Sequence, residues 1–230
     1  MSSGVVSFDL DETLWEFMPM MDGALRVTVE RLEQREPRAT GITLEELHRV
    51  RAEVALELEG TYEELRMESF RRVLAERGVF DPALPRWMVD TWMAARVEAV
   101  VLHDDVEPEL DELERRGFLL GAITNGNFPL DRLELAQRMA FIVHAERAGG
   151  EKPDAAPFAL AVELSGGLPS RWVHVGDSIE SDVVGAQAFG LKAVWINRRG
   201  CPRPEGVTPD AELPSLAGLT RVVEGLLAGA

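Results

Sequence analysis

The sequence predicts an α/β fold: a doubly wound parallel sheet with an all-helical domain inserted after the first strand. Two observations carry this prediction. After residue 118, short apolar segments alternate with helical patterns, which is typical of a parallel sheet with helices on both faces. Residues 20–102 instead show apolar side chains at helical spacing throughout. We therefore expect an α/β core domain of residues 1–16 and 104–230 and a helical domain of residues 17–103.

The first strand and the helical domain follow from the spacing of apolar residues. A buried strand is expected at residues 5–8, where a short apolar run ends in acidic residues at Asp9. Beyond it, apolar residues recur every three or four positions, as on one face of a helix. These helical faces cover residues 25–32, 44–58, 65–74 and 84–99. Thr43 and Glu46 have the spacing of a capping box at the start of the second helix.

The rest of the core domain is expected to alternate between strands and helices. Strands are predicted at residues 118–123, 141–143, 172–175 and 193–196, and helices near residue 110, at 155–164, at 182–189 and from Ser215. Residues 198–214 are rich in Pro, Gly and charge, so we predict a loop there. No internal repeat or low-complexity segment interrupts this order.

The composition excludes several classes of protein. The chain has 230 residues with 40 acidic and 24 basic side chains, and its formal charge of -16 opposes binding to nucleic acid or an anionic membrane. No apolar run approaches the ~20 residues of a membrane helix, and the first residues lack the pattern of a secretory leader. The single cysteine, Cys201, excludes an internal disulfide framework. We expect a cytoplasmic protein without nucleic-acid or membrane partners.

Polar residues follow four predicted strands, at the sheet edge where parallel sheets bind ligands. Alone, each group is typical of a turn or a helix cap. Together, in order on adjacent strands, they favour one shared site. The groups are Asp9 and Asp11 with Thr13; Thr124, Asn125 and Gly126; Gly150 to Pro153, which includes Lys152; and Gly176, Asp177 and Ser178, with Asp182 five residues after Asp177.

The chemistry of these side chains indicates a metal-assisted reaction on phosphorus. Asp9 and Asp11 point the same way as a strand ends, and Asp177 could complete a set of oxygen ligands suited to Mg²⁺. An EF-hand calcium loop is excluded, because Leu14 and Met20 occupy its glycine and glutamate positions. A carboxylate beside a cation can attack phosphorus to form an aspartyl-phosphate, while a neighbouring acid protonates the leaving oxygen.

The four segments resemble the four motifs of the haloacid dehalogenase superfamily, across nearly the whole core domain. The inserted helices resemble the C1-type cap of that family, so the core is expected to be Rossmann-like. One departure is that the segment before Lys152, at His144 to Glu146, lacks the serine often found there. The resemblance implies that Asp9 is the nucleophile and that Asp11 is the general acid and then the base. It implies that the phosphate binders are Thr124, Asn125 and Lys152, and that the Mg²⁺ ligands are Asp9, the Asp11 carbonyl and Asp177. Asp182 would orient the groups around the metal, and Ser178 would support the site without binding the metal directly.

Alternative functions differ in how they fit these residues. Dehalogenases of the superfamily lack a carboxylate at the position of Asp11, so its presence favours phosphoryl transfer. A phosphomutase remains open, because the same acid and base can return the phosphoryl group to a sugar. A non-catalytic binding protein on the same fold is the alternative outside enzymes. A serine esterase at Ser178 is excluded, because no histidine follows His174.

The substrate class follows from the helical domain and from the resemblance. A cap of this size leaves room for a small phosphorylated metabolite. Core segments such as 123–127 and 175–177 look most like bacterial phosphatases acting on flavin mononucleotide and on the ribitylamino-uracil phosphate of riboflavin synthesis. Arg66, on a helical face of the cap, is expected to be exposed, and the alternative is that it faces the cleft and contacts a substrate anion. The sequence predicts no oligomeric state and assigns Cys201 no role.

Overall fold

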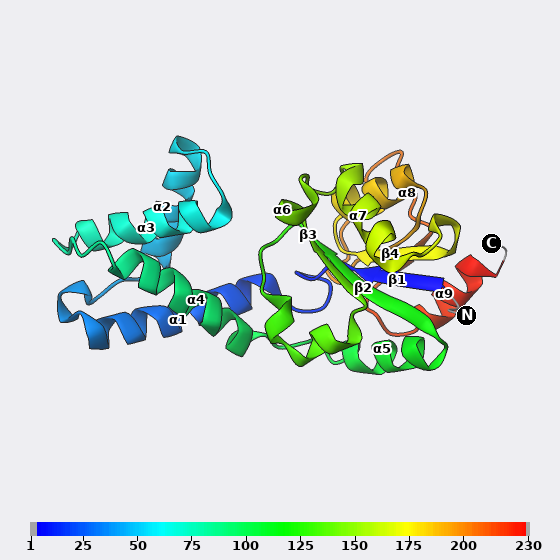
Figure 1. Cartoon of the computed structure of the whole chain (residues 1–230), viewed down its shortest axis with the longest axis horizontal. Helices are drawn as coiled ribbons and strands as arrows, with labels where there is room; N and C mark the ends of the chain where they lie inside the picture. The colour runs from blue at the N-terminus through cyan, green and yellow to red at the C-terminus, as the bar shows by residue number, and fades with distance from the viewer. Residues whose placement is uncertain (1–3, 229–230) are drawn as a thin grey trace. The chain divides into compact units, whose positions relative to one another are not determined.

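The structure is a computed structural model that describes residues 4–228. Contacts within the chain divide it into two compact units, both drawn in Figure 1. The first, which we call the core unit, comprises Met1–Glu16 and Val101–Ala230, and the second, the helical unit, comprises Phe17–Val100. Within residues 4–228 no helix has the length and apolar content of a membrane span.

The core unit contains a six-stranded parallel sheet with the strand order β3-β2-β1-β4-β5-β6. The first strand lies inside the sheet, and later strands add outward on both sides of it, which is the doubly wound arrangement predicted from the sequence. The predicted α/β fold class is thus confirmed. The strands are β1 (Gly4–Phe8), β2 (Phe118–Thr124), β3 (Phe141–His144), β4 (Trp172–Gly176), β5 (Lys192–Ile196) and β6 (Ala211–Leu213).

The prediction that residues 198–214 form only a loop was wrong, because β6 lies within them. This edge strand pairs in parallel with Val194 to Ile196 of β5. Asp210 holds its start, since one carboxylate oxygen accepts a hydrogen bond from the Ala193 amide (2.9 Å) and the other from Lys192 Nζ (2.9 Å). Three residues are too few for a periodic pattern, so the pairing depends on contacts with a neighbour distant in sequence.

Helices cover both faces of this sheet, with α7 and α8 on one side and α5 and α9 on the other (Figure 1). The helix predicted at 182–189 begins as a π-helical turn, and the one predicted from Ser215 begins at Leu219. The bounds are α5 (Val106–Arg115), α6 (Ala145–Ala148), α7 (Ala155–Ser165), α8 (Gly185–Phe189) and α9 (Leu219–Leu227), with the π-helical η5 (Ile179–Val184) and the 3-10 turns η2 (Leu130–Arg132), η3 (Glu134–Arg138) and η4 (Pro169–Arg171).

Aromatic side chains fill the layer between the sheet and its helices. Phe141 and Trp172 lie 5.4 Å apart between ring centroids, and Phe158 of α7 is fully buried beside them in the same cluster. Gly121 of β2 makes room for Phe141, because a Cβ at that position would lie 2.1 Å from the ring. This packing fixes the ends of β1, β2 and β4, which carry the predicted site residues.

The helical unit contains four α-helices. Helices that follow one another in the sequence pack together, and the first also packs against the last. α1 packs on α4, α4 on α3 and α3 on α2. Thr43 caps α2, since its hydroxyl oxygen accepts a hydrogen bond from the Glu46 amide (3.1 Å). The Glu46 carboxylate binds Arg77 (2.6 Å) rather than the cap amide, so only half of the predicted box forms. The bounds are α1 (Phe17–Arg35), α2 (Leu44–Glu57), α3 (Tyr62–Ala75) and α4 (Leu84–Ala99), with a 3-10 turn η1 (Pro37–Ala39).

The prediction that Arg66 is exposed was wrong. Only 6% of Arg66 is accessible, because the side chain lies against the rings of Phe70 and Trp92 inside the helical unit. An arginine on a mainly polar stretch of helix usually faces water, and nothing in the local sequence distinguishes a buried arginine from an exposed one.

Candidate active site

Asp9 is the first residue after β1, and its carboxylate contacts Lys152. The Asp9 amide donates to the Val175 carbonyl (2.8 Å), which continues the pairing of β1 with β4 and fixes the backbone at this point. Lys152 Nζ donates to Asp9 Oδ1 (2.8 Å). Burial raises the pKa of Asp9 above its ordinary range, although the Lys152 ammonium lowers it. An added cation would therefore favour the charged, nucleophilic form.

Lys152 uses all three protons of its ammonium group. Besides Asp9, Nζ donates to the Ile123 carbonyl (2.7 Å) and to Asp182 Oδ1 (2.6 Å), and the residue is 3% exposed. Burial opposes the charge, but the carboxylates of Asp182 and Asp9 outweigh it and raise the pKa of Lys152. A compact ammonium with three donors suits this cage, whereas a planar guanidinium does not.

Asn125 holds the backbone of Lys152 in place. Its side-chain amide donates to the Lys152 carbonyl (2.8 Å), and its oxygen accepts from the Lys152 amide (2.7 Å). Thr124, at the end of β2, accepts a hydrogen bond from the Gly126 amide through its hydroxyl oxygen (3.0 Å). Sequence reasoning expected Asn125 to bind phosphate, and the structure adds a positioning contact for its side chain.

Asp11 lies in the tight turn that follows β1. Glu12 adopts a left-handed conformation (φ 63°) within this turn, and Trp15 Nε1 donates to Asp11 Oδ1 (2.8 Å). The other carboxylate oxygen of Asp11 approaches Gly126 so closely that a Cβ there would lie 3.2 Å from it. The turn thus directs Asp11 toward the loop after β2, near Thr124.

Asp182 accepts hydrogen bonds through both carboxylate oxygens. Oδ1 accepts from Lys152 Nζ, and Oδ2 accepts from the Ser178 amide (2.9 Å). Although burial raises the pKa of Asp182, the charge of Lys152 and the hydrogen bond from His174 hold it well below its usual range. A Cβ on Gly176 would lie 2.2 Å from Asp182 Cγ, so only glycine allows this approach.

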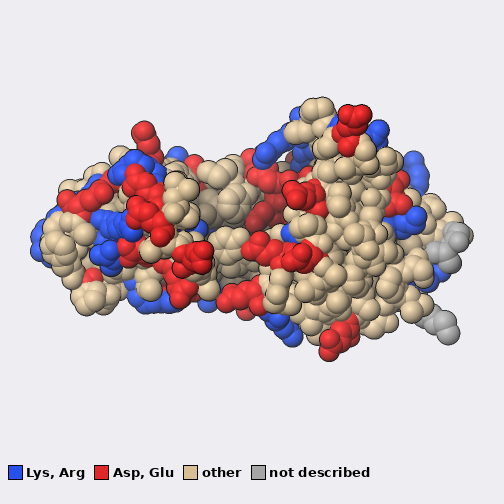
Figure 2. Space-filling model, turned by 90° about the horizontal axis from the view of Figure 1, so that it is seen from above, with Lys and Arg blue, Asp and Glu red and all other residues tan. Residues whose placement is uncertain are grey.

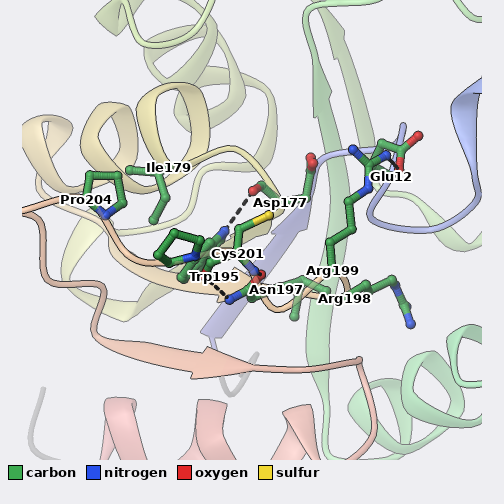
Figure 3. Close-up of a pocket in the computed structure, with 11 residues that line it drawn as sticks. Glu12, Asp177, Ile179, Trp195, Asn197, Arg198, Arg199, Cys201 and Pro204 are labelled. Carbon is green, nitrogen blue, oxygen red and sulfur yellow. Dashed lines mark hydrogen bonds and ion pairs between the residues drawn. The ribbon is translucent and has the colours of Figure 1, made fainter.

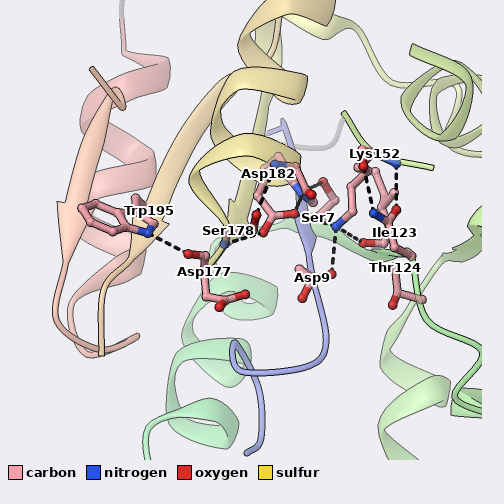
Figure 4. A network of polar contacts seen from close by, with 12 residues as sticks. Ser7, Asp9, Ile123, Thr124, Lys152, Asp177, Ser178, Asp182 and Trp195 are labelled. Atoms are coloured by element: carbon pink, nitrogen blue, oxygen red, sulfur yellow. Dashed lines mark hydrogen bonds and ion pairs between the residues drawn. The ribbon is translucent and has the colours of Figure 1, made fainter. Parts of the chain in front are cut away.

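Asp177 follows β4 and lies beside Asp182 (Figure 4). Its backbone carbonyl accepts a hydrogen bond from Trp195 Nε1 (2.7 Å), which anchors the strand end. Burial, with the nearby negative charge of Asp182, raises the pKa of Asp177 to about 7. Like Asp9, it is a carboxylate that lacks sufficient positive charge around it.

The carboxylates of Asp9, Asp177 and Asp182 form a group that fits a divalent cation. One oxygen from each lies within 4.8 Å of the others. Mg²⁺ takes few carboxylates and keeps its other positions for water and substrate phosphate, which matches this donor set. Both carboxylate oxygens of Asp182 already accept hydrogen bonds, from Lys152 and Ser178, whereas only one oxygen of Asp9 contacts Lys152, so Asp9 and Asp177 are the better direct ligands. The predicted contribution of Asp11 is its backbone carbonyl, which this grouping of side chains does not address.

A buried chain of hydrogen bonds beneath the site was not found from the sequence. Trp172 Nε1 donates to Ser7 Oγ (2.8 Å), and Ser7 Oγ lies 2.8 Å from His174 Nδ1. His174 Nε2 lies 3.2 Å from Asp182 Oδ1. Burial lowers the pKa of His174, so the chain fits a neutral ring that accepts from Ser7 and donates to Asp182. The signal in the sequence was that Ser7 and His174 are polar residues within two otherwise apolar strands, β1 and β4.

A pocket of 260 Å³ lies beside Asp177, and residues at the end of β5 form part of its wall (Figure 3). Arg198 and Arg199 line it, but each already has a carboxylate partner: Arg198 binds Asp105 (2.8 Å), and Arg199 binds Glu12. Cys201, also in its wall, is exposed and free of disulfide bonding. The pocket therefore offers space beside Asp177 rather than a cluster of unpaired charge.

The fold and the acidic strand ends define a doubly wound α/β protein with its candidate active site at the carboxyl ends of the strands. A family model described as haloacid dehalogenase-like hydrolase matches residues 4–190, and the chain belongs to that family. It is 30% identical to glyceraldehyde 3-phosphate phosphatase of Methanopyrus kandleri, over 96% of this chain and 97% of the relative. It is 26% identical to 5-amino-6-(5-phospho-D-ribitylamino)uracil phosphatase of Escherichia coli, over 95% of each.

Among solved structures, a 2-haloacid dehalogenase from Pseudomonas syringae pv. tomato superposes with a TM-score of 0.82. Its sequence is 33% identical, and the match covers 96% of this chain and 98% of that one. The curated relatives are phosphatases, so the predicted enzyme class, a phosphatase of the haloacid dehalogenase superfamily, is confirmed.

Proposed function

We propose that this enzyme hydrolyses a small phosphomonoester in a Mg²⁺-dependent reaction that proceeds through an aspartyl-phosphate on Asp9. The contact between Lys152 Nζ and Asp9 Oδ1 (2.8 Å), with Asp177 in the same carboxylate group, supports this most directly. It leaves the second oxygen of Asp9 for attack and places positive charge beside it. Asp9, Asp177 and the Asp11 carbonyl would hold Mg²⁺, which when bound supplies charge that neutralises the phosphoryl oxygens.

Each residue then has a defined part in two successive steps. Asp9 forms a bond to phosphorus as the bond to the ester oxygen breaks, and Asp11 gives that oxygen its proton. In the second step Asp11 takes a proton from water, which attacks phosphorus and releases Asp9 and inorganic phosphate. In this proposal the Thr124 hydroxyl and the positive charge of Lys152 stabilise the negative charge of the phosphoryl oxygens. Asp182 and Ser178 act through Lys152 and the loop after β4.

The likeness to a 2-haloacid dehalogenase supports a second candidate, hydrolytic dehalogenation at carbon. That reaction releases halide, which needs no proton, so it leaves Asp11 without a function. The test is a parallel assay of p-nitrophenyl phosphate and 2-chloropropionate, each with Mg²⁺ or with EDTA. Phosphate release that EDTA abolishes, without chloride release, is expected. Chloride release that survives EDTA would overturn the proposal.

The covalent intermediate has a separate test in Asp11→Asn. This variant keeps the nucleophile but lacks the acid and base, so with an acyl phosphate, whose leaving group needs little protonation, phosphoenzyme should accumulate. Acid-quenched protein analysed by mass spectrometry should carry one phosphoryl group on Asp9. A variant that carries none, while the wild type turns over, contradicts the intermediate. Release of inorganic phosphate also separates this reaction from a phosphomutase, which keeps the group in its product, and from a non-catalytic binding protein.

For the substrate, we propose that the helical unit acts as the cap that selects a small phosphorylated metabolite in the cytoplasm. Flavin mononucleotide and ribitylamino-uracil phosphate are the leading candidates, and the similarity to the Escherichia coli phosphatase supports the second. The kcat/KM for each should exceed that for p-nitrophenyl phosphate. If another metabolite exceeds both by about tenfold, or ~1.4 kcal/mol of transition-state binding, the flavin assignment fails and the general one stands.

A further inference from the structure

Two arginines are buried around one tryptophan in the helical unit. Arg66 of α3 is 6% exposed, and Arg96 of α4 is 2% exposed. The guanidinium carbon of each lies 4.8 Å from the centroid of the Trp92 ring. Two positive charges therefore lie close together, inside the unit and away from water.

No described acidic residue compensates the charge of Arg66. Its Nε and Nη1 atoms are buried and make no hydrogen bond with the described residues, and the same is true of Trp92 Nε1. Burial, and to a smaller extent the positive charges of Arg51 and Arg96, lowers the pKa of Arg66 to about 10. Arg66 is therefore still a cation at neutral pH. Three donor nitrogens on two adjacent side chains are thus left for a ligand.

Several other arginines of the helical unit have acidic partners. Arg71 pairs with Glu68 (2.6 Å) on the same helix as Arg66, and Arg77 pairs with Glu46 (2.6 Å). On the face seen in Figure 2, the Arg side chains of this unit lie among Asp and Glu side chains. A buried cation without a partner destabilises a fold, and an apolar side chain of similar size would serve packing better. Contacts with aromatic faces offset only part of that effect.

We propose that Arg66, Arg96 and Trp92 form an oxyanion-binding site within the helical unit. A guanidinium matches a carboxylate or phosphate group with two parallel hydrogen bonds, and the indole N–H adds a third donor. The ligand class is a small carboxylate or phosphate. Binding at this site does not depend on the proposed function. Where the oxyanion is a second anionic group of the phosphorylated substrate, that role rests on the proposed function.

The binding test uses the full chain in EDTA, with malonate as the probe and calorimetry and thermal unfolding as readouts. Arg66→Met is compared with Arg71→Met, a control on the same helix whose side chain is 59% exposed. Malonate should bind the wild type and the control and raise their Tm, whereas Arg66→Met should bind at least about tenfold more weakly. Without malonate, Arg66→Met should unfold at the same or a higher temperature, because a buried charge is gone.

Equal binding of malonate by Arg66→Met, or no binding by the wild type, would overturn the site. If Arg66→Met does not fold, Arg66→Lys replaces it, since a lysine keeps the charge but loses the planar fork. That variant should also bind malonate about tenfold more weakly than the wild type. A lower Tm with unchanged binding would show that Arg66 only stabilises the fold.

A second arm identifies the source of the oxyanion. 3-Phosphoglycerate and glycerol 3-phosphate differ in a carboxylate, and kcat/KM is measured for both with wild type and Arg66→Met. A loss confined to 3-phosphoglycerate assigns the oxyanion to the substrate, and equal values assign it to a separate small molecule. Both results support the site once malonate binding is lost in the variant. Absence of hydrolysis of both esters and of p-nitrophenyl phosphate contradicts the proposed function and leaves the malonate result unaffected.

Discussion

At the scale of single residues, the site depends on Lys152. Its ammonium donates to a carboxylate just after β1, to a carbonyl of β2 and to a carboxylate on the π-helical turn, so one side chain connects three segments. The arrangement sets the charge on both carboxylates. Asp182 stays ionised, while Asp9 has a raised pKa that added positive charge would lower.

Replacing Asp9, the proposed nucleophile, should remove the reaction without removing the fold. Asp9→Asn keeps the size of the side chain but cannot attack phosphorus, so kcat should fall more than ~100-fold, or ~3 kcal/mol. Steady-state phosphate release measures the loss, and circular dichroism checks folding. Asp131→Asn, an exposed change in the core unit, is the control and should keep wild-type activity. Residual activity above a hundredth of wild type would contradict the role of Asp9.

The two lysines of the chain allow a matched comparison. Lys152→Arg forces a planar guanidinium into a cage built for three tetrahedral donors, so kcat should fall ~100-fold or more. Lys192→Arg changes a lysine whose side chain is 47% exposed and which pairs with Asp210, so activity and Tm should stay near wild type. Phosphate release and thermal unfolding measure both variants. Similar activity in the two would show that the cage tolerates arginine.

At the scale of elements, the turn after β4 decides the position of Asp182. The segment Ile179–Val184 is π-helical, and Ser178 caps it by accepting a hydrogen bond from the Ser181 amide (3.2 Å). The turn thereby brings the Asp182 side chain back to the end of β4, where its carboxylate packs directly against Gly176. A π-helical turn is uncommon and is frequently found at functional sites, which agrees with its place here.

The close approach of Asp182 predicts a strong effect of a single methyl group. Gly176→Ala would place a Cβ 2.2 Å from Asp182 Cγ, so the carboxylate must move and release Lys152. A displacement of this size should lower kcat ~100-fold. Gly225→Ala in α9 meets no atom within 4 Å and should leave kcat unchanged while raising stability by ~0.5–1 kcal/mol. Wild-type kcat in Gly176→Ala would refute this account of the turn.

At the scale of the whole molecule, the net charge of -16 works against a phosphorylated substrate. The core unit offsets this repulsion locally, because it contains the buried ammonium of Lys152 and a set of three carboxylates that fits Mg²⁺. Without a cation the same carboxylates repel one another, so the free energy of unfolding should depend on pH and on metal together.

The direction of that dependence follows from Asp177. Its pKa rises from 3.8 to about 7 on folding, so between these values the folded protein holds a proton that the unfolded chain releases, and stability falls as pH rises. Each pKa unit is worth ~1.4 kcal/mol. Asp9 acts in the same direction. The lowered pKa of Asp182 acts oppositely, and its contribution is lost at lower pH, as the pH falls through its folded pKa.

Urea unfolding in EDTA at several pH values between 4 and 8 measures this effect. Asp177→Asn should reduce the slope of stability against pH, whereas Asp131→Asn should keep it. Mg²⁺ should stabilise the wild type more at pH 8 than at pH 5, because it binds the ionised carboxylates. An unchanged slope in Asp177→Asn, or equal stabilisation by Mg²⁺ at both pH values, would count against the carboxylate group as a cation site.

The sequence alone determined the α/β fold class, five of the six strands and the four polar segments of the candidate site. This was possible because apolar periodicity is local, and because parallel strands bring their carboxyl ends to one edge of the sheet. Tertiary structure decided what depends on distant residues. Lys152 and Asp9 are 143 positions apart, β6 exists only by pairing with β5, and the burial of Arg66 comes from Trp92 on another helix. Such contacts leave no local pattern, since the energy that forms them arises only when the chain has folded.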